Sequence, residues 1–229
     1  MLALAERDDR VVAAAVIGSL ALGEGDDWSD LDLTFGLAED ASLQDVLADW
    51  TSDLADAFDA APLFDLARGE LTYRVFLLPA WLQVDLSFGV GSTVQARDAF
   101  RPLFGPSRRK HVEPESAHEL FGLAVLYARH ALVAIERGQT WHAEYCVSWV
   151  RHQALTLACR RRELPTADGK GFDLVPQDVR SRFDDALVRS LEPAELRRAL
   201  AVAVSGLLEE AADVGTAQIE AQLRGLTRR

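Results

Sequence analysis

The chain has 229 residues, 49% hydrophobic and 26% charged, a composition that excludes a disordered or fibrous protein because it supplies enough apolar material for a core. It carries 24 basic and 36 acidic residues, a formal net charge of −12, which disfavours general nucleic-acid binding and favours cationic partners. The length predicts one large domain or two small ones.

The sequence shows no sign of a membrane or secretory protein. No apolar run approaches the ~20 residues that span a bilayer, and Glu6, Asp8 and Asp9 interrupt the N-terminal stretch that a signal peptide would keep apolar. Cys146 and Cys159 lie on one predicted helix about 20 Å apart, too far for a disulfide. We therefore expect a cytoplasmic protein with reduced cysteines and no membrane contact.

Two strands are predicted near the N-terminus. Residues 11–18 (VVAAAVIG) form a continuous apolar run, which is typical of a strand buried on both faces. Residues 30–35 (DLDLTF) alternate polar and apolar side chains, which predicts a strand with one core face and one acidic face.

A helix and a strand pair follow. Ser42 with Asp45 three residues later, before apolar residues at spacings of three and four, predicts a helix over residues 42–58. Residues 71–78 and 81–88 predict two paired strands, and alternation places Asp85 on the polar face of the second.

The second half of the chain is predicted to be helical. Residues 101–114 (RPLFGPSRRKHVEP) show neither the alternation of a strand nor the three-to-four spacing of a helix, and they indicate a linker. A capping box of Ser116 and Glu119 opens a helix, and further helices are predicted to begin near Thr140, Pro176 and Pro193. The expected fold class is α+β, with a mixed sheet and flanking helices in a first domain (1–105) and an all-helical second domain (115–229).

The segment with the strongest chemical signal is residues 18–35 (GSLALGEGDDWSDLDLTF). Asp30 and Asp32, at i and i+2 of a strand, share a face about 6.6 Å apart along the backbone, and carboxylate oxygens are ligands that Mg²⁺ prefers. Gly18 permits close backbone approach, and Ser19 offers a hydroxyl and an N–H to a phosphate. An isolated Asp-x-Asp usually marks a solvated strand edge, but the nearby Gly-Ser and the third acid Asp85 favour a metal site.

This pattern resembles the nucleotidyltransferases of the DNA polymerase β-like superfamily, over roughly the first 90 residues. The resemblance implies a nucleotidyltransferase-type sheet in which Asp30 and Asp32 hold Mg²⁺ and Asp85 is the third ligand or the base. It also implies that Gly18 and Ser19 bind the triphosphate. An acceptor hydroxyl would then attack the α-phosphate and release pyrophosphate.

The short chain and helical second half are most similar to the small aminoglycoside and lincosamide nucleotidyltransferases of antibiotic resistance. The expected enzyme transfers AMP from ATP to a hydroxyl of a small, cationic acceptor. One departure is Leu22, where many members carry Arg, so Arg68, Arg74 or Lys170 would have to supply positive charge to the nucleotide. The alternatives are an enzyme that modifies a protein or tRNA, as toxin–antitoxin members do, and a catalytically silent nucleotide-binding module. The acceptor, the donor base and the oligomeric state stay open.

One polar face of the second half offers a substrate contact. Glu144, Ser148 and Arg151 align on one side of the predicted helix, since seven residues make nearly two turns. A solvated face is the simpler interpretation. The functional one is that Glu144 faces a cleft between the domains and binds an acceptor amine or accepts the hydroxyl proton, as a helical-domain carboxylate does in some of the aminoglycoside enzymes that the chain resembles.

Overall fold

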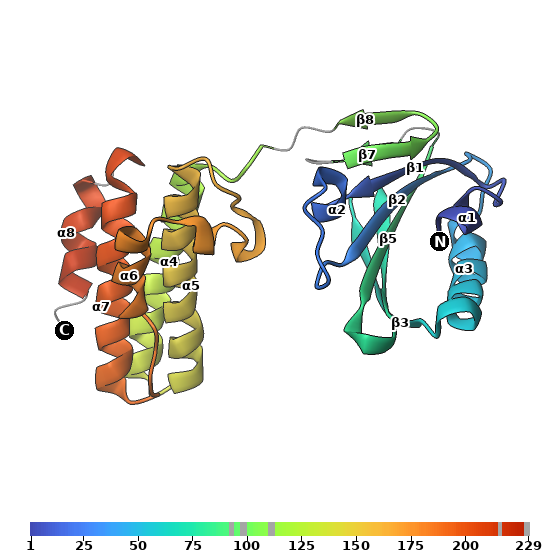
Figure 1. Cartoon of the computed structure of the whole chain (residues 1–229). Helices are drawn as coiled ribbons and strands as arrows, with labels where there is room; N and C mark the ends of the chain where they lie inside the picture. The colour runs from blue at the N-terminus through green and yellow to red at the C-terminus, as the bar shows by residue number, and fades with distance from the viewer. Residues whose placement is uncertain (92–93, 97–99, 110–112, 215–216, 227–229) are drawn as a thin grey trace. The chain divides into compact units, whose positions relative to one another are not determined.

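The computed structural model describes residues 1–91, 94–96, 100–109, 113–214 and 217–226. The chain divides into two compact units, Met1–Val112 and Glu113–Arg229, and each is described by itself. Unit 1 combines a sheet with helices, whereas unit 2 consists of helices and short 3₁₀ turns (Figure 1). The predicted α+β fold class is confirmed.

The described part of unit 1 is built on a six-stranded sheet in the order β3-β4-β5-β2-β1-β7. The strands are β1 (Val11–Ile17), β2 (Leu31–Leu37), β3 (Ala61–Arg68), β4 (Leu71–Leu77), β5 (Gln83–Val90) and β7 (Phe100–Phe104). A two-stranded parallel sheet joins β6 (Val94–Ala96) and β8 (Ser107–Arg109). The large sheet is mixed because β2 and β5 run parallel while its other neighbouring strands run antiparallel.

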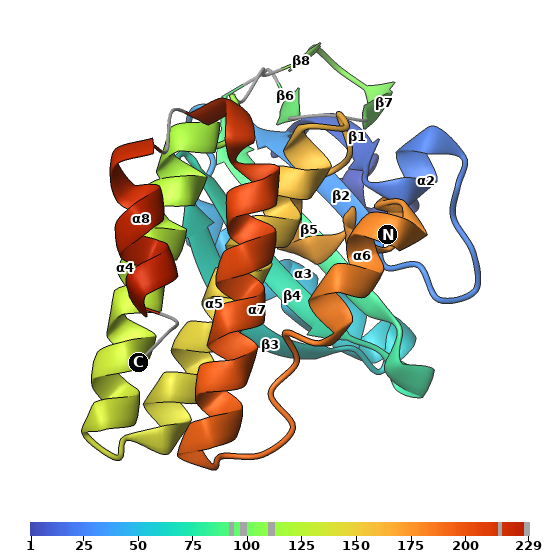
Figure 2. The same ribbon diagram turned by 90° about the vertical axis from the view of Figure 1, so that its left-hand side faces the viewer.

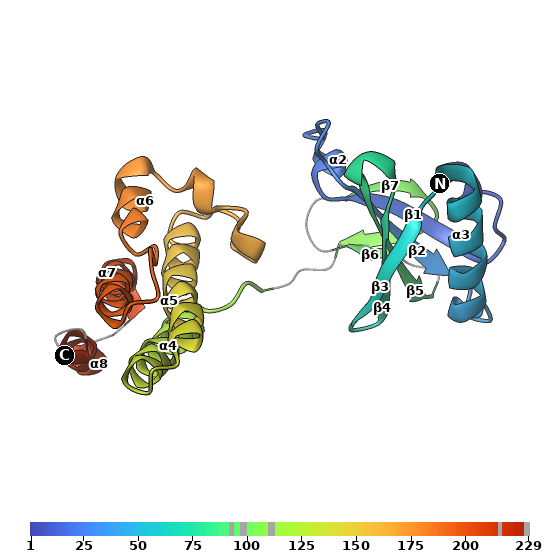
Figure 3. The ribbon, with the colours of Figure 1, turned by 90° about the horizontal axis from the view of Figure 1, so that it is seen from below.

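The helices of unit 1 are short except for one. They are α1 (Leu2–Ala5), α2 (Ser19–Leu22), α3 (Leu43–Phe58) and the 3₁₀ turn η1 (Pro79–Trp81). The predicted helix over 42–58 is confirmed as α3, and the Ser42 hydroxyl accepts a hydrogen bond from the backbone N–H of Asp45 at 3.3 Å. Figure 3 shows α3 lying along the sheet.

The core of unit 1 lies between α3 and one face of the sheet. Its centre is a cluster of three rings, Phe35 of β2, Trp50 of α3 and Phe88 of β5, whose centroids lie 4.9–5.3 Å apart. All three side chains are almost completely buried. Because side chains alternate along a strand, Asp32 and Asp85 point to the opposite face of the sheet.

The predicted linker over 101–114 is wrong for its first part. β7 pairs with β1 as an edge strand of the large sheet, and β8 pairs with β6. Pro102 suggested a break because it lacks an N–H, but an edge strand tolerates this since one side of its backbone makes no ladder bonds. β3 was not predicted either. It is exposed along its whole length, so its sequence does not alternate between buried apolar and exposed polar residues.

Unit 2 is a helical bundle. Its helices are α4 (Ala117–Glu136), α5 (Thr140–Arg160), α6 (Gln177–Asp184), α7 (Pro193–Glu210) and α8 (Ala217–Leu226), with the 3₁₀ turns η2 (Ala167–Gly169), η3 (Phe172–Leu174) and η4 (Ala212–Val214). The longest of these are α4, α5 and α7, and Figure 2 shows them beside one another. The predicted capping box is confirmed: Glu119 N–H donates to Ser116 Oγ, and Ser116 N–H donates to a Glu119 carboxylate oxygen.

The core of unit 2 contains both cysteines and the apolar helix α4. Cys146 and Cys159 are buried and free on α5, and burial raises the pKa of both thiols. Among the described helices, α4 is long and apolar enough to cross a membrane by length and composition alone. That is weak support for a span, because a core helix passes the same test and Leu120, Phe121 and Ala124 of α4 are buried in the bundle.

Asp8 connects the N-terminal segment to α3 and gives the first prediction. Its carboxylate accepts hydrogen bonds from Arg10 Nε at 2.8 Å and Trp50 Nε1 at 2.8 Å, and the Arg10 guanidinium is the main cause that lowers the pKa of Asp8 to about 2. Because the pKa of Asp8 is lower in the folded chain than in the unfolded chain, its carboxylate contributes to the free energy of unfolding. This contribution is present above about pH 4 and disappears as the pH falls through about 2. Asp8→Asn should therefore lower the free energy of unfolding by about 1–2 kcal/mol at pH 7 and change it little near pH 2.

Urea denaturation at a series of pH values, followed by tryptophan fluorescence, measures this difference. Asp49→Asn is the matched control, because Asp49 pairs with the same arginine at 2.8 Å but is 60% exposed, and an exposed pair contributes little. Equal losses in the two variants, or a loss for Asp8→Asn that persists at pH 2, would contradict the assignment.

Candidate functional site

Three strand ends of unit 1 meet at one edge of the sheet. β1 runs antiparallel to β2, so the end of β1 lies beside the start of β2. β5 runs parallel to β2, so it begins at the same edge. The topology therefore places Gly18 and Ser19, which follow β1, next to the acidic residues that open β2 and β5.

The structure brings together the three predicted acidic residues. Asp32 and Asp85 are directly opposite each other in the β2–β5 register. Asp30, Asp32 and Asp85 are half-buried, and each offers one carboxylate oxygen within 4.8 Å of the others. Gln83 Nε2 donates to Asp85 Oδ1 at 3.0 Å, which helps to orient this carboxylate. The arrangement could hold a divalent metal ion.

Gly18 is required where it stands. Its φ of 71° and ψ of −155° lie in a region that is essentially restricted to glycine. A Cβ built at this position would lie 2.5 Å from Asp32 Oδ2. Only glycine lets the chain leave β1 so close to the Asp32 carboxylate, so the geometry gives a physical reason for the Gly-Ser next to the Asp-x-Asp.

The donor set defines the chemistry that the site can support. Three carboxylates are hard oxygen ligands, which suit Mg²⁺ or Mn²⁺, and Mg²⁺ keeps further positions for water and substrate phosphates. Soft or borderline metals prefer nitrogen and sulfur ligands, which this cluster lacks. The site therefore fits a hard divalent cation.

Negative charge is concentrated in the part of the sequence that contains this site, and the net charge of the whole chain does not show this. Residues 1–91 contain 4 basic and 18 acidic residues, a net charge of −14, whereas residues 92–229 contain 20 basic and 18 acidic residues, a net charge of +2. Residues 11–67, which include both Asp30 and Asp32, contain 13 acidic residues and no Lys, Arg or His. A polyphosphate would be repelled here unless a cation neutralised the carboxylates.

The structure bears on Arg74, one of the three residues that the resemblance left open as a source of positive charge. Arg74 is unsuitable, because its guanidinium pairs with Asp65 through two 2.6 Å bonds and donates to the carbonyl of Leu47 in α3. It thus belongs to the helix-covered face. Arg101 of β7 is exposed, but it pairs with Val16, whose side chain packs in the core on the α3 side, so Arg101 lies on that same face and not on the face of Asp32.

Glu144 lies on α5 of unit 2, in the polar row that was predicted. Ser148 Oγ donates to Glu144 Oε1 at 2.7 Å, and Arg151 Nη2 donates to Ser148 Oγ at 3.2 Å. Arg151 also donates to the carbonyl of Ala186 at 3.0 Å, and burial lowers the pKa of its guanidinium. The row is therefore a connected chain of hydrogen bonds. A role for Glu144 in substrate binding is not tested by this geometry and stays a prediction.

An aromatic cluster lies along the same helix. Trp149 of α5 stacks on Tyr127 of α4 with centroids 5.4 Å apart, and Tyr145 and His152 contact Trp149 edge-on. These contacts show that the rings pack against one another. Trp141, at the start of α5, is 75% exposed.

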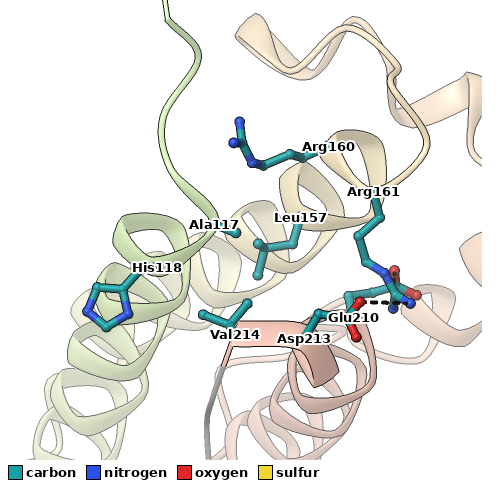
Figure 4. Close-up of a pocket in the computed structure, with 8 residues that line it drawn as sticks. All are labelled: Ala117, His118, Leu157, Arg160, Arg161, Glu210, Asp213 and Val214. Atoms are coloured by element: carbon teal, nitrogen blue, oxygen red, sulfur yellow. Dashed lines mark ion pairs between the residues drawn. The ribbon is translucent and has the colours of Figure 1, made fainter.

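Unit 2 also contains a pocket of about 450 Å³ near the start of α4 and the ends of α5 and α7 (Figure 4). Leu157 and Val214 supply apolar lining, while Arg160 and Arg161 supply charge. Glu210, only 4% exposed, accepts a 2.8 Å hydrogen bond from Arg162 Nη1. The lining contains none of the predicted site residues.

Comparison with known proteins gives little further information. No protein-family model matches the chain, and no curated protein matches it in sequence. Among solved structures, it is similar to an aminoglycoside 6-adenyltransferase from Bacillus subtilis, with a TM-score of 0.42 and 8% identity over 98% of this chain and 95% of that chain. A likeness this weak does not assign a family or an activity.

The close approach of Gly18 to Asp32 gives a prediction about metal binding. In Gly18→Ala the new methyl group would displace the Asp32 carboxylate, so Mn²⁺ affinity should fall at least about tenfold. The strained backbone should also lower the free energy of unfolding by about 1–3 kcal/mol. Isothermal titration calorimetry with Mn²⁺ measures the first effect, and urea denaturation measures the second.

Gly23→Ala is the matched control. Gly23 also has a positive φ, 77°, but a Cβ there would meet nothing within 4 Å. This variant should lose stability and keep its Mn²⁺ affinity. If both variants bind Mn²⁺ like the unmodified chain, the contact between Gly18 and Asp32 does not support a metal site.

Proposed function

We propose that the chain is a Mg²⁺-dependent nucleotidyltransferase that transfers a nucleoside monophosphate, AMP from ATP, to a hydroxyl group of a small cationic acceptor. The observation that carries the proposal is the convergence of Asp30, Asp32 and Asp85 within 4.8 Å, beside Gly18, which both its backbone conformation and its close approach to Asp32 restrict to glycine. The location of the charge of −14 in residues 1–91 supports a cationic acceptor.

Each residue would have a limited task in this reaction. Asp30, Asp32 and Asp85 would hold Mg²⁺, which neutralises charge that develops on the phosphate oxygens. The Ser19 hydroxyl and backbone N–H would bind the triphosphate without adding charge.

The transfer step requires a base and an aligned hydroxyl. The acceptor oxygen forms a bond to the α-phosphorus, the bond from this phosphorus to the bridging oxygen breaks, and pyrophosphate leaves. The acceptor proton passes to a carboxylate, which is Asp85 or Glu144 in this proposal. No nucleophilic side chain is needed, and positioning with charge stabilisation supplies the rate.

Substitution of the three acidic residues tests the proposal. Asp30→Asn, Asp32→Asn and Asp85→Asn should each lower transfer at least about 100-fold, because each loses charge that stabilises the transition state. The assay supplies labelled nucleoside triphosphates, Mg²⁺ and a panel of aminoglycosides, lincosamides, tRNA and proteins, and measures label transfer and pyrophosphate release. Asp53→Asn is the matched control, because it removes the same charge from the exposed face of α3.

Nucleotide binding gives a separate measurement for the same variants. The unmodified chain should bind ATP measurably with Mg²⁺ or Mn²⁺ and not with EDTA. Asp85→Asn distinguishes its two roles: loss of metal-dependent ATP binding indicates a ligand, and retained binding with lost transfer indicates the base. Metal-independent binding without transfer to any acceptor would instead favour a silent binding module.

Glu144 provides a prediction about the acceptor. Glu144→Gln should weaken acceptor use and leave ATP binding unchanged, with a fall in kcat of roughly 10²–10⁴-fold if Glu144 is the general base. If it only binds the acceptor, the change should be mainly in KM. Glu136→Gln is the control, because Glu136 is an exposed α4 carboxylate paired with Arg197 at 2.7 Å. Unchanged steady-state kinetics in Glu144→Gln would remove it from the site and leave Asp85 as the base.

A further inference from the structure

Two tryptophans stand almost fully exposed where the strands of the acidic site begin. Trp28, in the loop that leads into β2, is 93% exposed, and Trp81, in the turn that leads into β5, is 84% exposed. β2 and β5 run parallel, so both residues lie toward the edge of the sheet that carries the three carboxylates. Figure 1 shows the starts of both strands at this end of unit 1.

Hydrogen bonds hold the turn that presents Trp28. Asp26 Oδ1 accepts a hydrogen bond from the Trp28 N–H at 2.9 Å and from Ser29 Oγ at 3.0 Å, and these bonds lower the pKa of Asp26. The turn places an exposed indole two residues before Asp30. Packing in unit 1 does not explain the ring, because Trp28 belongs to none of the described core clusters.

Trp81 is presented by a turn that is costly to form. The Leu78 N–H donates to the carbonyl of Leu82 at 2.8 Å, and Ala80 and Trp81 between them have φ values of 62° and 66°. Each non-glycine residue in this left-handed region costs roughly 1–2 kcal/mol. Asn or Gly would make the turn without this cost, so stability of the fold does not account for Trp81.

Both rings are within reach of a molecule bound at the carboxylates. Trp28 precedes Asp32 by four residues, and Trp81 precedes Asp85 by four residues, a separation of at most about 13 Å along an extended backbone. A compound of two or three linked rings spans such a distance. One ring could contact an indole while a hydroxyl on another lies at the metal site.

The surrounding charge indicates which substrate the rings would bind. The segment 11–67 contains Trp28, 13 acidic residues and no basic residue. Ring compounds with ammonium groups gain from this field and from cation–π contact, for which tryptophan is the best side chain. A neutral nucleobase gains from stacking alone and draws no attraction from the acidic field.

We propose that Trp28 and Trp81 bind the ring faces of the acceptor, an amino-substituted multi-ring compound, and so determine which acceptors present a hydroxyl to the three carboxylates. This inference rests on the proposed function, and it names the acceptor class and the residues that select it. The two indoles are binding residues, and the transfer chemistry stays with the carboxylates.

Calorimetric titration tests the proposal with kanamycin, which has several amino-substituted rings, as the probe. Trp28→Ala and Trp81→Ala should each weaken kanamycin binding about 5- to 30-fold, and the double variant should weaken it more. Affinity for ATP with Mg²⁺ should stay within about twofold. Fully N-acetylated kanamycin keeps the rings and loses the charges, so the unmodified chain should bind it much more weakly.

Phe58→Ala is the matched control, because Phe58 is a 43% exposed aromatic residue at the end of α3, in the layer that covers the opposite face of the sheet. It should bind kanamycin like the unmodified chain. Thermal melts of all variants check that each is folded, since neither tryptophan contributes to a buried cluster.

The outcomes separate this inference from the proposed function. Unchanged kanamycin affinity in the double variant, or no binding by the unmodified chain, overturns the role of the indoles while metal-dependent ATP binding still decides the proposed function. Weaker ATP binding with unchanged kanamycin binding also overturns it, because the rings would then hold the nucleobase. Tryptophan-dependent kanamycin binding without any nucleotidyl transfer supports the binding site and contradicts the proposed function.

Discussion

The parallel pairing of β2 with β5 is the constraint on which the acidic site depends. It sets Asp32 directly opposite Asp85, although 52 residues of chain lie between them. A slip of one residue would turn the side chains of one strand to the other face of the sheet. The Asp85 carboxylate would then face α3, and Leu86 would face the solvent side. The chemistry of the site is therefore a consequence of strand register.

The apolar core is what holds that register. Phe35 and Phe88, opposite each other on β2 and β5, both contact Trp50 of α3 on the far side of the sheet. Aromatic rings bury a large area and prefer specific edge and offset geometries. Any slip would separate these rings as well as the carboxylates. Core packing on one face thus positions acidic groups on the other, without requiring those groups to stabilise the fold.

Concentration of negative charge in residues 1–91 has opposing effects. Clustered carboxylates repel one another and disfavour the compact state, whereas they attract divalent cations and ammonium groups. Residues 92–229, with a net charge of +2, do not share this field. Buried charge in unit 2 is instead paired, as in the contact between Arg162 and Glu210 that joins the ends of α5 and α7. Charged residues are therefore distributed differently: acidic residues accumulate in residues 1–91, whereas the buried Glu210 of unit 2 is paired between helices.

Local signals in the sequence were sufficient for the strands β1, β2, β4 and β5, for the long helices and for two of the three carboxylates. Alternation placed Asp30 and Asp32 on one face of a strand, and the Gly-Ser marked the end of the preceding strand. Ser42 and the Ser116–Glu119 pair marked the starts of helices. These patterns could be read from the sequence because they depend only on neighbouring residues. Only the tertiary structure decided that Asp85 lies opposite Asp32, that residues 100–104 form an edge strand, and that Trp28 and Trp81 are exposed. Each of these depends on which strands pair, and pairing is set by packing between residues that are far apart in the chain.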